Sequence, residues 1–292
     1  GFHNGFWDAL QAGGRKAAAE LGISLEFRGL PPTAGNDRVA AQSALFDEFA
    51  SRGFQGIVFA PSDRIRMATP VRKAVIKGIK VVAVDSPVET PLLSGIFATN
   101  NYEGGRIAGR TMGRLLAGRG DVLLLAHPTR DNQATRDREL AFADELKSNF
   151  PGIRLVSADR TGGATLETDI PAVRKLLDDF PGVKGVYGIS GTGLEAFMVV
   201  LEERKLAGKV ALVGWDSGPA VLEGLRRGSV SAIIQQNPER MAYEGVMAVY
   251  RAIQGKDRRE MVDTGVAVIT RDNLDSPEIR KLIRPDYRDW VR

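Results

Sequence analysis

Ten polar or aromatic side chains lie at the ends of predicted strands or in the loops and helix starts that follow them. This is the edge where open parallel sheets bind their ligands. Carboxylates accept hydrogen bonds from pairs of hydroxyls, Arg and Asn donate in planar forks, and aromatic rings stack on C–H faces. Together these groups match a neutral polyol such as a sugar. The ten candidate binding residues are Asn4, Phe6, Trp7, Asp85, Asn132, Arg136, Arg138, Ser190, Asp216 and Gln236.

The charged candidates also have structural interpretations. Asp85 and Asp216 end the runs KVVAVD and ALVGWD, where an aspartate can simply cap the turn that follows. Arg136 and Arg138 could form the exposed start of a helix. The joint pattern is therefore a stronger indication of a site than any one of its members.

The two aromatic candidates are not expected to point the same way. Phe6 and Trp7 are adjacent in a predicted helix, where neighbours do not share a face, so at least one ring is expected to point away from the core. Trp215, beside Asp216, is expected to pack behind the site rather than to contact a ligand.

Enzyme motifs are weak in this sequence. The stretch Gly191-Thr-Gly193-Leu-Glu-Ala196 follows a strand and precedes Asp216 by about twenty residues, as in a dinucleotide fingerprint. However, strand-to-helix turns favour glycine in general, and this one lies at the seventh predicted strand. The stretch Gly188-Ile-Ser190-Gly191 is no nucleophile elbow, because its second glycine comes one residue early and both histidines precede the serine.

Composition excludes further classes of site. The 292 residues contain no Cys and only two His, which removes disulfides, thiol nucleophiles, Cys-based zinc sites and His-based metal triads, so no cofactor or metal is predicted. The net charge of +4 is scattered, unlike the concentrated basic faces of nucleic-acid-binding proteins. Four carboxylates are expected on solvated faces: Asp159, Asp169, Asp178 and Asp179.

Short apolar runs alternate with longer amphipathic stretches, and this order predicts an α/β protein with parallel sheets. The predicted strands are Ile23–Phe27, Gly56–Phe59, Lys80–Val84, Gly95–Ala98, Asp121–Ala126, Ile153–Ser157, Lys184–Tyr187, Val210–Gly214, Ser231–Ile234 and Val266–Thr270. The predicted helices are Phe6–Leu21, Val39–Arg52, Arg64–Lys77, Tyr102–Ala117, Arg136–Asn149, Leu166–Asp179, Gly193–Lys205, Ala220–Arg227 and Arg240–Gln254.

The length of the chain predicts two compact lobes. The alternation opens on a helix, so we expect a first strand upstream of Gly1. The residues GFHNGFWDAL show no signal peptide, and no apolar run approaches the roughly 18 residues of a membrane span, so a mature or trimmed chain is expected.

Several short stretches, in order and spacing, resemble the type I periplasmic sugar-binding protein family, close to the ribose-binding receptors of ABC transporters. The family shares its fold with the effector domains of lactose-repressor-type regulators. The matching stretches span nearly the whole chain: Asn4-Gly-Phe6-Trp7, Gly13-Gly14, Gly53 to Pro61, Gly78 to Asp85, Thr99 to Gly105, Ala134 to Phe142, Val213-Gly-Trp-Asp216 and Gln235-Gln-Asn-Pro238.

The resemblance implies an α/β fold of two doubly wound parallel-sheet lobes joined by a three-stranded hinge. The N-terminal lobe would take residues 1–99 and 238–263, and the C-terminal lobe 100–237 and 264–292. The hinge crossings would lie near Thr99–Asn101, Gln236–Pro238 and Asp263–Gly265.

The same resemblance implies a function. The chain would be a periplasmic or otherwise extracytoplasmic receptor, a monomer and not an enzyme, that closes around a monosaccharide or polyol and delivers it to a membrane permease. Phe6 and Trp7 would stack on the ligand, while the polar candidates would contact its hydroxyls. The ribose-type pattern has Arg in place of Ser86 and Asn in place of Ser190, so ribose itself is not the expected ligand.

Two other interpretations stay open at the level of sequence. The chain could be the sugar-responsive effector domain of a lactose-repressor-type transcription regulator, in which case a helix-turn-helix would precede it. It could also be an NAD-dependent enzyme that uses the glycine turn, and calorimetry would then show binding of a nicotinamide cofactor.

Overall fold

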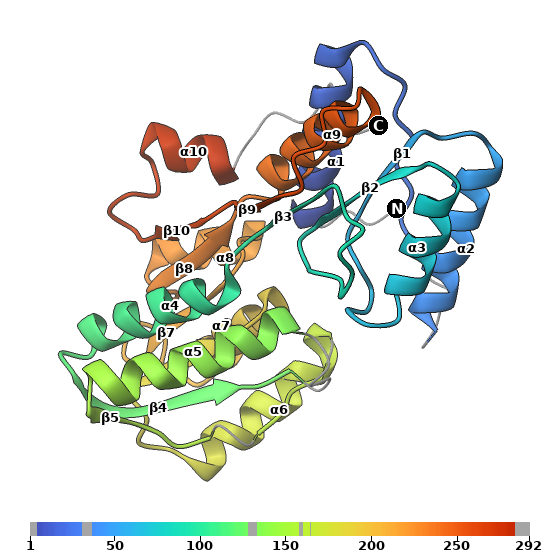
Figure 1. Cartoon of the computed structure of the whole chain (residues 1–292). Helices are drawn as coiled ribbons and strands as arrows, with labels where there is room; N and C mark the ends of the chain where they lie inside the picture. Colours follow the sequence, from blue (N-terminus) through green and yellow to red (C-terminus); the bar gives the residue numbers. More distant parts are fainter. Residues whose placement is uncertain (1–4, 31–36, 128–132, 158–159, 164, 284–292) are drawn as a thin grey trace. The chain divides into compact units, whose positions relative to one another are not determined.

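The chain folds into two units, each built on one sheet with helices on both faces (Figure 1). The computed structural model describes residues 5–30, 37–127, 133–157, 160–163 and 165–283. Within the described residues, the first unit takes the chain up to Thr99 and the segment Asn237–Gly265; the second takes Asn100–Gln236 and residues 266–283. The predicted α/β class with two doubly wound sheets is confirmed.

The sheet of the first unit has four parallel strands in the order β1-β2-β3-β9. Its two faces are covered differently. Side chains of α2 and α3 pack on one face around Phe46, Val71 and Ala83, and those of α1 and α9 pack on the other around Leu10 and Val84. The elements of this unit are α1 (Gly5–Leu21), α2 (Arg38–Ser51), β1 (Gly56–Phe59), α3 (Ala68–Ile76), β2 (Lys80–Val84), β3 (Gly95–Ala98), α9 (Pro238–Ile253) and β9 (Glu260–Asp263).

The sheet of the second unit has six strands in the order β10-β8-β7-β6-β4-β5, and only the β10–β8 pair is antiparallel. Its elements are α4 (Asn101–Leu115), β4 (Arg119–Leu125), α5 (Gln133–Asn149), β5 (Gly152–Leu155), α6 (Leu166–Asp179), β6 (Gly185–Gly188), α7 (Gly191–Glu203), β7 (Ala211–Trp215), α8 (Pro219–Arg227), β8 (Ala232–Gln236), β10 (Val266–Ile269) and α10 (Pro277–Ile283).

Successive side chains of a strand point to opposite faces of the sheet, and this explains how the second sheet buries both of its faces. In β4, Leu123 and Leu125 pack with the side chains of α6, α7 and α8, whereas Val122 and Leu124 pack with those of α4 and α5. Near-continuous apolar strands are what such a doubly covered sheet requires. No helix in the described ranges combines the length and the apolar character needed to cross a bilayer.

The sequence located most elements to within a few residues, and three points were wrong. Ile23–Phe27 forms no strand, because a strand exists only through a hydrogen-bonded neighbour and no ladder among the described residues includes this segment. The short strand β9 and the helix α10 were missed, since both are too short to show a period. The strand β10 is antiparallel to β8, although parallel sheets were expected.

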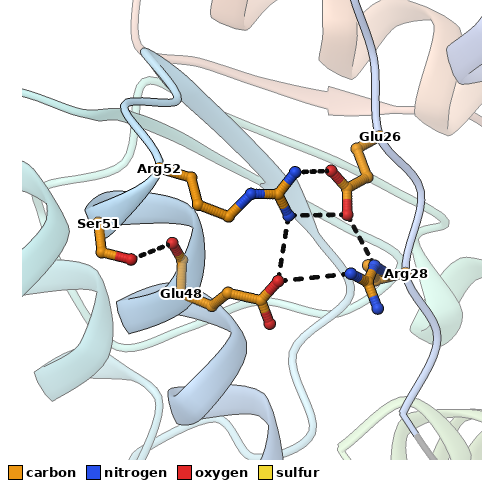
Figure 2. Close-up of polar contacts among 5 residues, drawn as sticks. All are labelled: Glu26, Arg28, Glu48, Ser51 and Arg52. Atoms are coloured by element: carbon orange, nitrogen blue, oxygen red, sulfur yellow. Dashed lines mark hydrogen bonds and ion pairs between the residues drawn. The ribbon is translucent and has the colours of Figure 1, made fainter.

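The segment that carries Ile23–Phe27 is instead tied to α2 by ion pairs (Figure 2). The Glu26 carboxylate accepts from Arg52 Nη2 at 2.6 Å and from Arg28 Nε at 2.7 Å. Glu48 accepts from Arg52 Nη1 at 3.1 Å, which closes the network on the helix. The Arg52 and Arg28 guanidinium groups lower the pKa of Glu26 to about 2.

This network predicts an acid-sensitive contribution to stability. A carboxyl whose folded-state pKa is depressed adds stability above its unfolded pKa, near 4.5, and loses it as the pH falls toward 2. Glu26→Gln should therefore reduce the loss of melting temperature between pH 5 and pH 2, and 1 M salt should shrink the difference because the pair is solvent-exposed. Glu244→Gln, which removes a local pair with Arg240, is the control. Identical acid profiles for Glu26→Gln and the unmodified protein would contradict the assignment.

Candidate functional site

The second unit holds a buried arginine at the centre of a polar cluster. Arg138, on α5, is only 5% exposed. Its Nε donates to Asn101 Oδ1 at 2.8 Å and its Nη1 donates to the Ile189 carbonyl at 3.1 Å. The guanidinium carbon lies 3.6 Å from the centre of the Trp215 ring, within the range of a cation–π contact. The structure therefore fixes this cation in one plane and one position.

Trp215 is itself anchored from behind. Its Nε1 donates to the Tyr187 hydroxyl at 2.6 Å, and the Tyr187 ring stacks on Phe142 at 4.0 Å between centroids. All three rings are fully buried, and burial raises the pKa of Tyr187 above its ordinary value. The expectation that Trp215 packs behind the site agrees with this burial, and its ring supports the guanidinium.

Two adjacent glycines of α4 leave room for this arrangement. A Cβ on Gly104 would overlap the six-membered ring of Trp215, and a Cβ on Gly105 would come within 2.6 Å of the Arg138 carbonyl oxygen. The close packing of α4 on α5 and on Trp215 thus depends on the missing side chains at these two positions. Asn101 starts the same helix, so α4 both makes space for Arg138 and provides its partner.

Asp216 lies directly after β7 and adopts a left-handed backbone with φ of 62°. Its N–H donates to the Ile234 carbonyl at 3.0 Å, and its two carboxylate oxygens each accept from Gln236 Nε2 at 3.1 Å. Burial raises the pKa of Asp216, while the charge of Arg138 and the hydrogen bonds of Gln236 act in the opposite direction. An ionised carboxylate here is costly and is stabilised mainly by its neighbours.

Gln236 ends β8 and is 2% exposed. Its Nε2 donates to Asp216, whereas its Oε1 is buried without a hydrogen-bond partner among the described residues. An orphaned buried acceptor costs free energy unless a donor reaches it. The cluster therefore offers acceptors at Asp216 and Gln236 next to the cationic donor Arg138.

Ser190 belongs to the same edge of the sheet, since it follows β6 and β6 pairs with β7. It is the N-cap of α7, and its Oγ accepts from the Gly193 N–H at 3.2 Å. A Cβ on Gly191 would stand 4.0 Å from Asp216 Cβ, which places this turn beside Asp216. The structure thus brings together four sequence-predicted residues: Arg138, Ser190, Asp216 and Gln236.

One other predicted residue of the second unit, Arg136, is not part of this cluster. Arg136 is exposed, and two positions along a helix separate it from Arg138 by about 200° around the axis. Asn132 and Asn4 lie outside the described residues.

The first unit carries the remaining candidates. Asp85 follows β2 with φ of 67°, and its N–H donates to the Phe97 carbonyl at 3.1 Å. This geometry parallels that of Asp216 at the end of β7. Phe6 and Trp7 meet edge to face at 5.2 Å and both pack, half-buried, on the core of their unit. The expectation that at least one of them points away from the core was wrong, because side chains as large as these reach the core from the rim of the helix face.

Sequence reasoning missed three residues that matter here. Asn101 and Tyr187 support the arginine and the tryptophan, although neither stands out in a single sequence by type or spacing. Asp169 was expected on a solvated face and is 2% exposed, because α6 turns it inward from its first turn. Only a break in the polar pattern of this helix could have suggested its burial.

Gly188, which ends β6 just before the glycine turn, has a structural explanation. A Cβ on Gly188 would come within 2.5 Å of the Leu194 backbone nitrogen, so the residue permits close approach of α7 to the strand. No three metal-ligating side chains come together in the part of the chain that the structure describes.

Comparison with known proteins gives a consistent result. The model of the periplasmic binding protein domain matches residues 1–257. The D-allose-binding periplasmic protein of Escherichia coli K12 is 24% identical, over 83% of this chain and 79% of its own length.

Solved structures agree with this match. A carbohydrate transporter solute-binding protein from Agrobacterium radiobacter, in complex with D-arabinose, is 25% identical with a TM-score of 0.87 and covers 97% of this chain and 95% of its own. An ABC transporter solute-binding protein from Burkholderia graminis C4D1M, also in complex with D-arabinose, is 28% identical with a TM-score of 0.86 and covers 94% of each chain.

The burial of Asp216 predicts a pH effect on the unliganded protein. Because its folded-state pKa is raised, the contribution of this group to stability is full below its unfolded pKa, near 3.8, and is lost as the pH rises through the folded value. Asp216→Asn removes the charge, so its melting temperature relative to the unmodified protein should increase from pH 4 to pH 7. Asp272→Asn, at an exposed position, is the control. A difference in melting temperature between Asp216→Asn and the unmodified protein that stays constant from pH 4 to pH 7 would contradict the prediction.

Tight packing around Gly104 predicts that Gly104→Ala destabilises the protein, although alanine has the higher helix propensity. Gly104→Ala must displace Trp215 or α4, at a cost of about 1–3 kcal/mol that offsets the roughly 1 kcal/mol gained from alanine in a helix. Gly14→Ala in α1 is the matched control, because its Cβ would meet nothing closer than 3.8 Å. Urea unfolding should show Gly104→Ala less stable than Gly14→Ala by about 1–3 kcal/mol. Equal stabilities would show that the helix pair has room for the methyl group.

Proposed function

Since this chain belongs to the periplasmic binding protein domain family, we propose that it is a receptor for a monosaccharide or related polyol and delivers it to the permease of an ABC transporter. It binds and releases its ligand without catalysing a reaction. It acts as a monomer on the extracytoplasmic side of the membrane. The names of its relatives favour this role over that of a repressor effector domain.

One observation carries the proposal: a buried donor, a buried acceptor and a half-buried carboxylate meet at one edge of the second sheet. Arg138 is held in place by Asn101 and Trp215, and the acceptors are the Asp216 carboxylate and Gln236 Oε1. A sugar hydroxyl both donates and accepts, so one hydroxyl pair can serve all three groups. An anionic ligand would meet the Asp216 carboxylate, and an apolar one would leave Gln236 Oε1 without a donor.

The proposal also assigns residues of the first unit to the ligand. Asp85 repeats the strand-end geometry of Asp216, and Phe6 and Trp7 provide aromatic surface for C–H faces. A ligand that needs contacts from both units stabilises the conformations in which both can reach it. In this scheme, closure is a shift of population driven by the contacts that only the closed form makes.

The first test is a ligand screen. A thermal-shift assay against pentoses, hexoses, inositols and sugar alcohols should show at least one compound that raises the melting temperature, since a ligand that binds only the folded state stabilises it by mass action. A nucleotide and an amino-acid panel are the controls. No shift with any neutral polyol would reject the proposed class of ligand.

The second test separates the two arginines of α5. Arg138→Ala should weaken binding of the ligand found in the screen by roughly 10-fold or more, the effect of a lost charge-assisted hydrogen bond of about 1.5–3 kcal/mol. Lys147→Ala, exposed on the same helix, should bind normally in calorimetry. The ligand affinity of Arg136→Ala, measured in the same way, decides whether Arg136 contributes to binding, as the sequence predicts. Unchanged affinity of Arg138→Ala would overturn the site.

A further inference from the structure

A tyrosine hydroxyl lies in the apolar core of the second unit. Tyr187, on β6, is fully buried and belongs to one cluster with apolar side chains such as Val213 and Ile234. A phenylalanine ring at this position would bury the same apolar surface and would not have to remove a hydroxyl from water. The hydroxyl of Tyr187 therefore calls for a reason that packing does not provide.

The hydroxyl oxygen accepts a hydrogen bond from Trp215. The distance from Trp215 Nε1 to this oxygen is 2.6 Å, and a buried indole N–H needs such an acceptor. The Tyr187 ring is in turn stacked on Phe142, with an angle of 13° between the two planes. The six-membered ring of Trp215 lies where a side chain at position 104 would otherwise be, against α4. The indole is thus held at its N–H by Tyr187 and at its six-membered ring by α4.

The face of this indole carries the Arg138 guanidinium, whose central carbon is 3.6 Å from the ring centre. Tryptophan is the aromatic side chain that attracts a cation most strongly. The hydrogen bonds from Arg138 to Asn101 Oδ1 and to the Ile189 carbonyl restrain the guanidinium within its plane, and the indole supports its face. The orientation of the cation therefore depends on the orientation of the indole.

The hydrogen bond from Trp215 to Tyr187 also acts on the strength of this contact. An N–H group that donates to an oxygen shifts electron density into its ring, and polar interactions in buried surroundings reinforce one another in this way. A more electron-rich indole face attracts the guanidinium more strongly. Tyr187 thus both orients the indole and strengthens its hold on Arg138.

We propose that Tyr187 is a positioning residue for ligand binding: through Trp215 it holds the Arg138 guanidinium in the orientation that the ligand meets. The inference rests on the proposed sugar-binding function and deepens it. Tyr187 itself is fully buried and touches no ligand. Ligand affinity depends on this hydroxyl because a guanidinium that is ordered before the ligand arrives loses less freedom on binding.

Tyr187→Phe tests the proposal, since it removes the hydroxyl and keeps the ring on Phe142. The probe is the sugar that gives the largest shift in the thermal-shift screen, titrated by calorimetry. Tyr187→Phe should bind it about threefold to tenfold more weakly than the unmodified protein, the range for a weakened cation–π contact. Tyr102→Phe is the matched control, because it removes a hydroxyl that donates to Asp144 at an exposed position of the same unit. It should bind the sugar with unchanged affinity.

A double-mutant cycle separates positioning from a general effect on the fold. In the Arg138→Ala background the group that Tyr187 positions is gone, so adding Tyr187→Phe should change the affinity by less than about twofold. A damaged fold would weaken binding in both backgrounds alike. An NMR spectrum of the indole N–H groups provides a second readout, because the Trp215 signal should move upfield in Tyr187→Phe as its hydrogen bond is lost.

Trp215→Phe breaks the same hydrogen bond from the other side. It keeps an aromatic face for Arg138 but has no N–H, so it should also weaken binding by about threefold to tenfold. Adding Tyr187→Phe to Trp215→Phe should then change the affinity by less than about twofold, since the link between the two residues is already cut. This variant carries the test if Tyr187→Phe alone shows no cooperative unfolding transition.

Two results overturn the inference and leave the proposed function standing. One is that a sugar binds Tyr187→Phe, or Trp215→Phe in its place, as tightly as it binds the unmodified protein. The other is that Tyr187→Phe weakens binding as much in the Arg138→Ala background as in the unmodified protein. If no sugar or polyol binds the unmodified protein, the proposed function fails and the inference fails with it.

Discussion

The buried guanidinium of Arg138 is the constraint on which the second unit depends. A cation removed from water is stabilised only if partners replace its hydration, and this one has an amide oxygen, a backbone carbonyl and the face of Trp215. Each partner sits on a different element. Helix α4 must come close enough to supply Asn101, and that approach is possible because Gly104 and Gly105 have no side chains. The site is thus built into the packing of the unit rather than added to its surface.

Neighbouring groups also offset the cost of burying the Asp216 carboxylate. Burial penalises ionised Asp216, yet Gln236 and the charge of Arg138 compensate in part, so the donor and the acceptor of the site stabilise each other before any ligand arrives. Asp85 and Asp216 both leave their strands with a left-handed backbone, a conformation that costs free energy in residues other than glycine.

Much of the fold could be predicted from the sequence because its signals are local. Apolar runs such as Lys80–Val84 and Gly95–Ala98 are short, unbroken and bounded by turn residues, so their positions agree with the structure exactly. Ile23–Phe27 has the same local character but forms no strand, since pairing depends on a neighbour that local sequence does not reveal. The short strand β9 was missed for the converse reason, because its place in the sheet comes from its pairing with β3.

For the site, the sequence by itself determined which residue types stand at the ends of strands, and Asp216, Gln236, Arg138 and Ser190 follow from that rule. Only the tertiary structure decided which of them meet. It separated Arg138 from Arg136, buried Asp169, and recruited Asn101 and Tyr187, neither of which has a distinguishing pattern. The physical reason is that strand order and helix packing bring together residues far apart in the chain, while burial and hydrogen-bond direction depend on neighbours that sequence spacing does not specify.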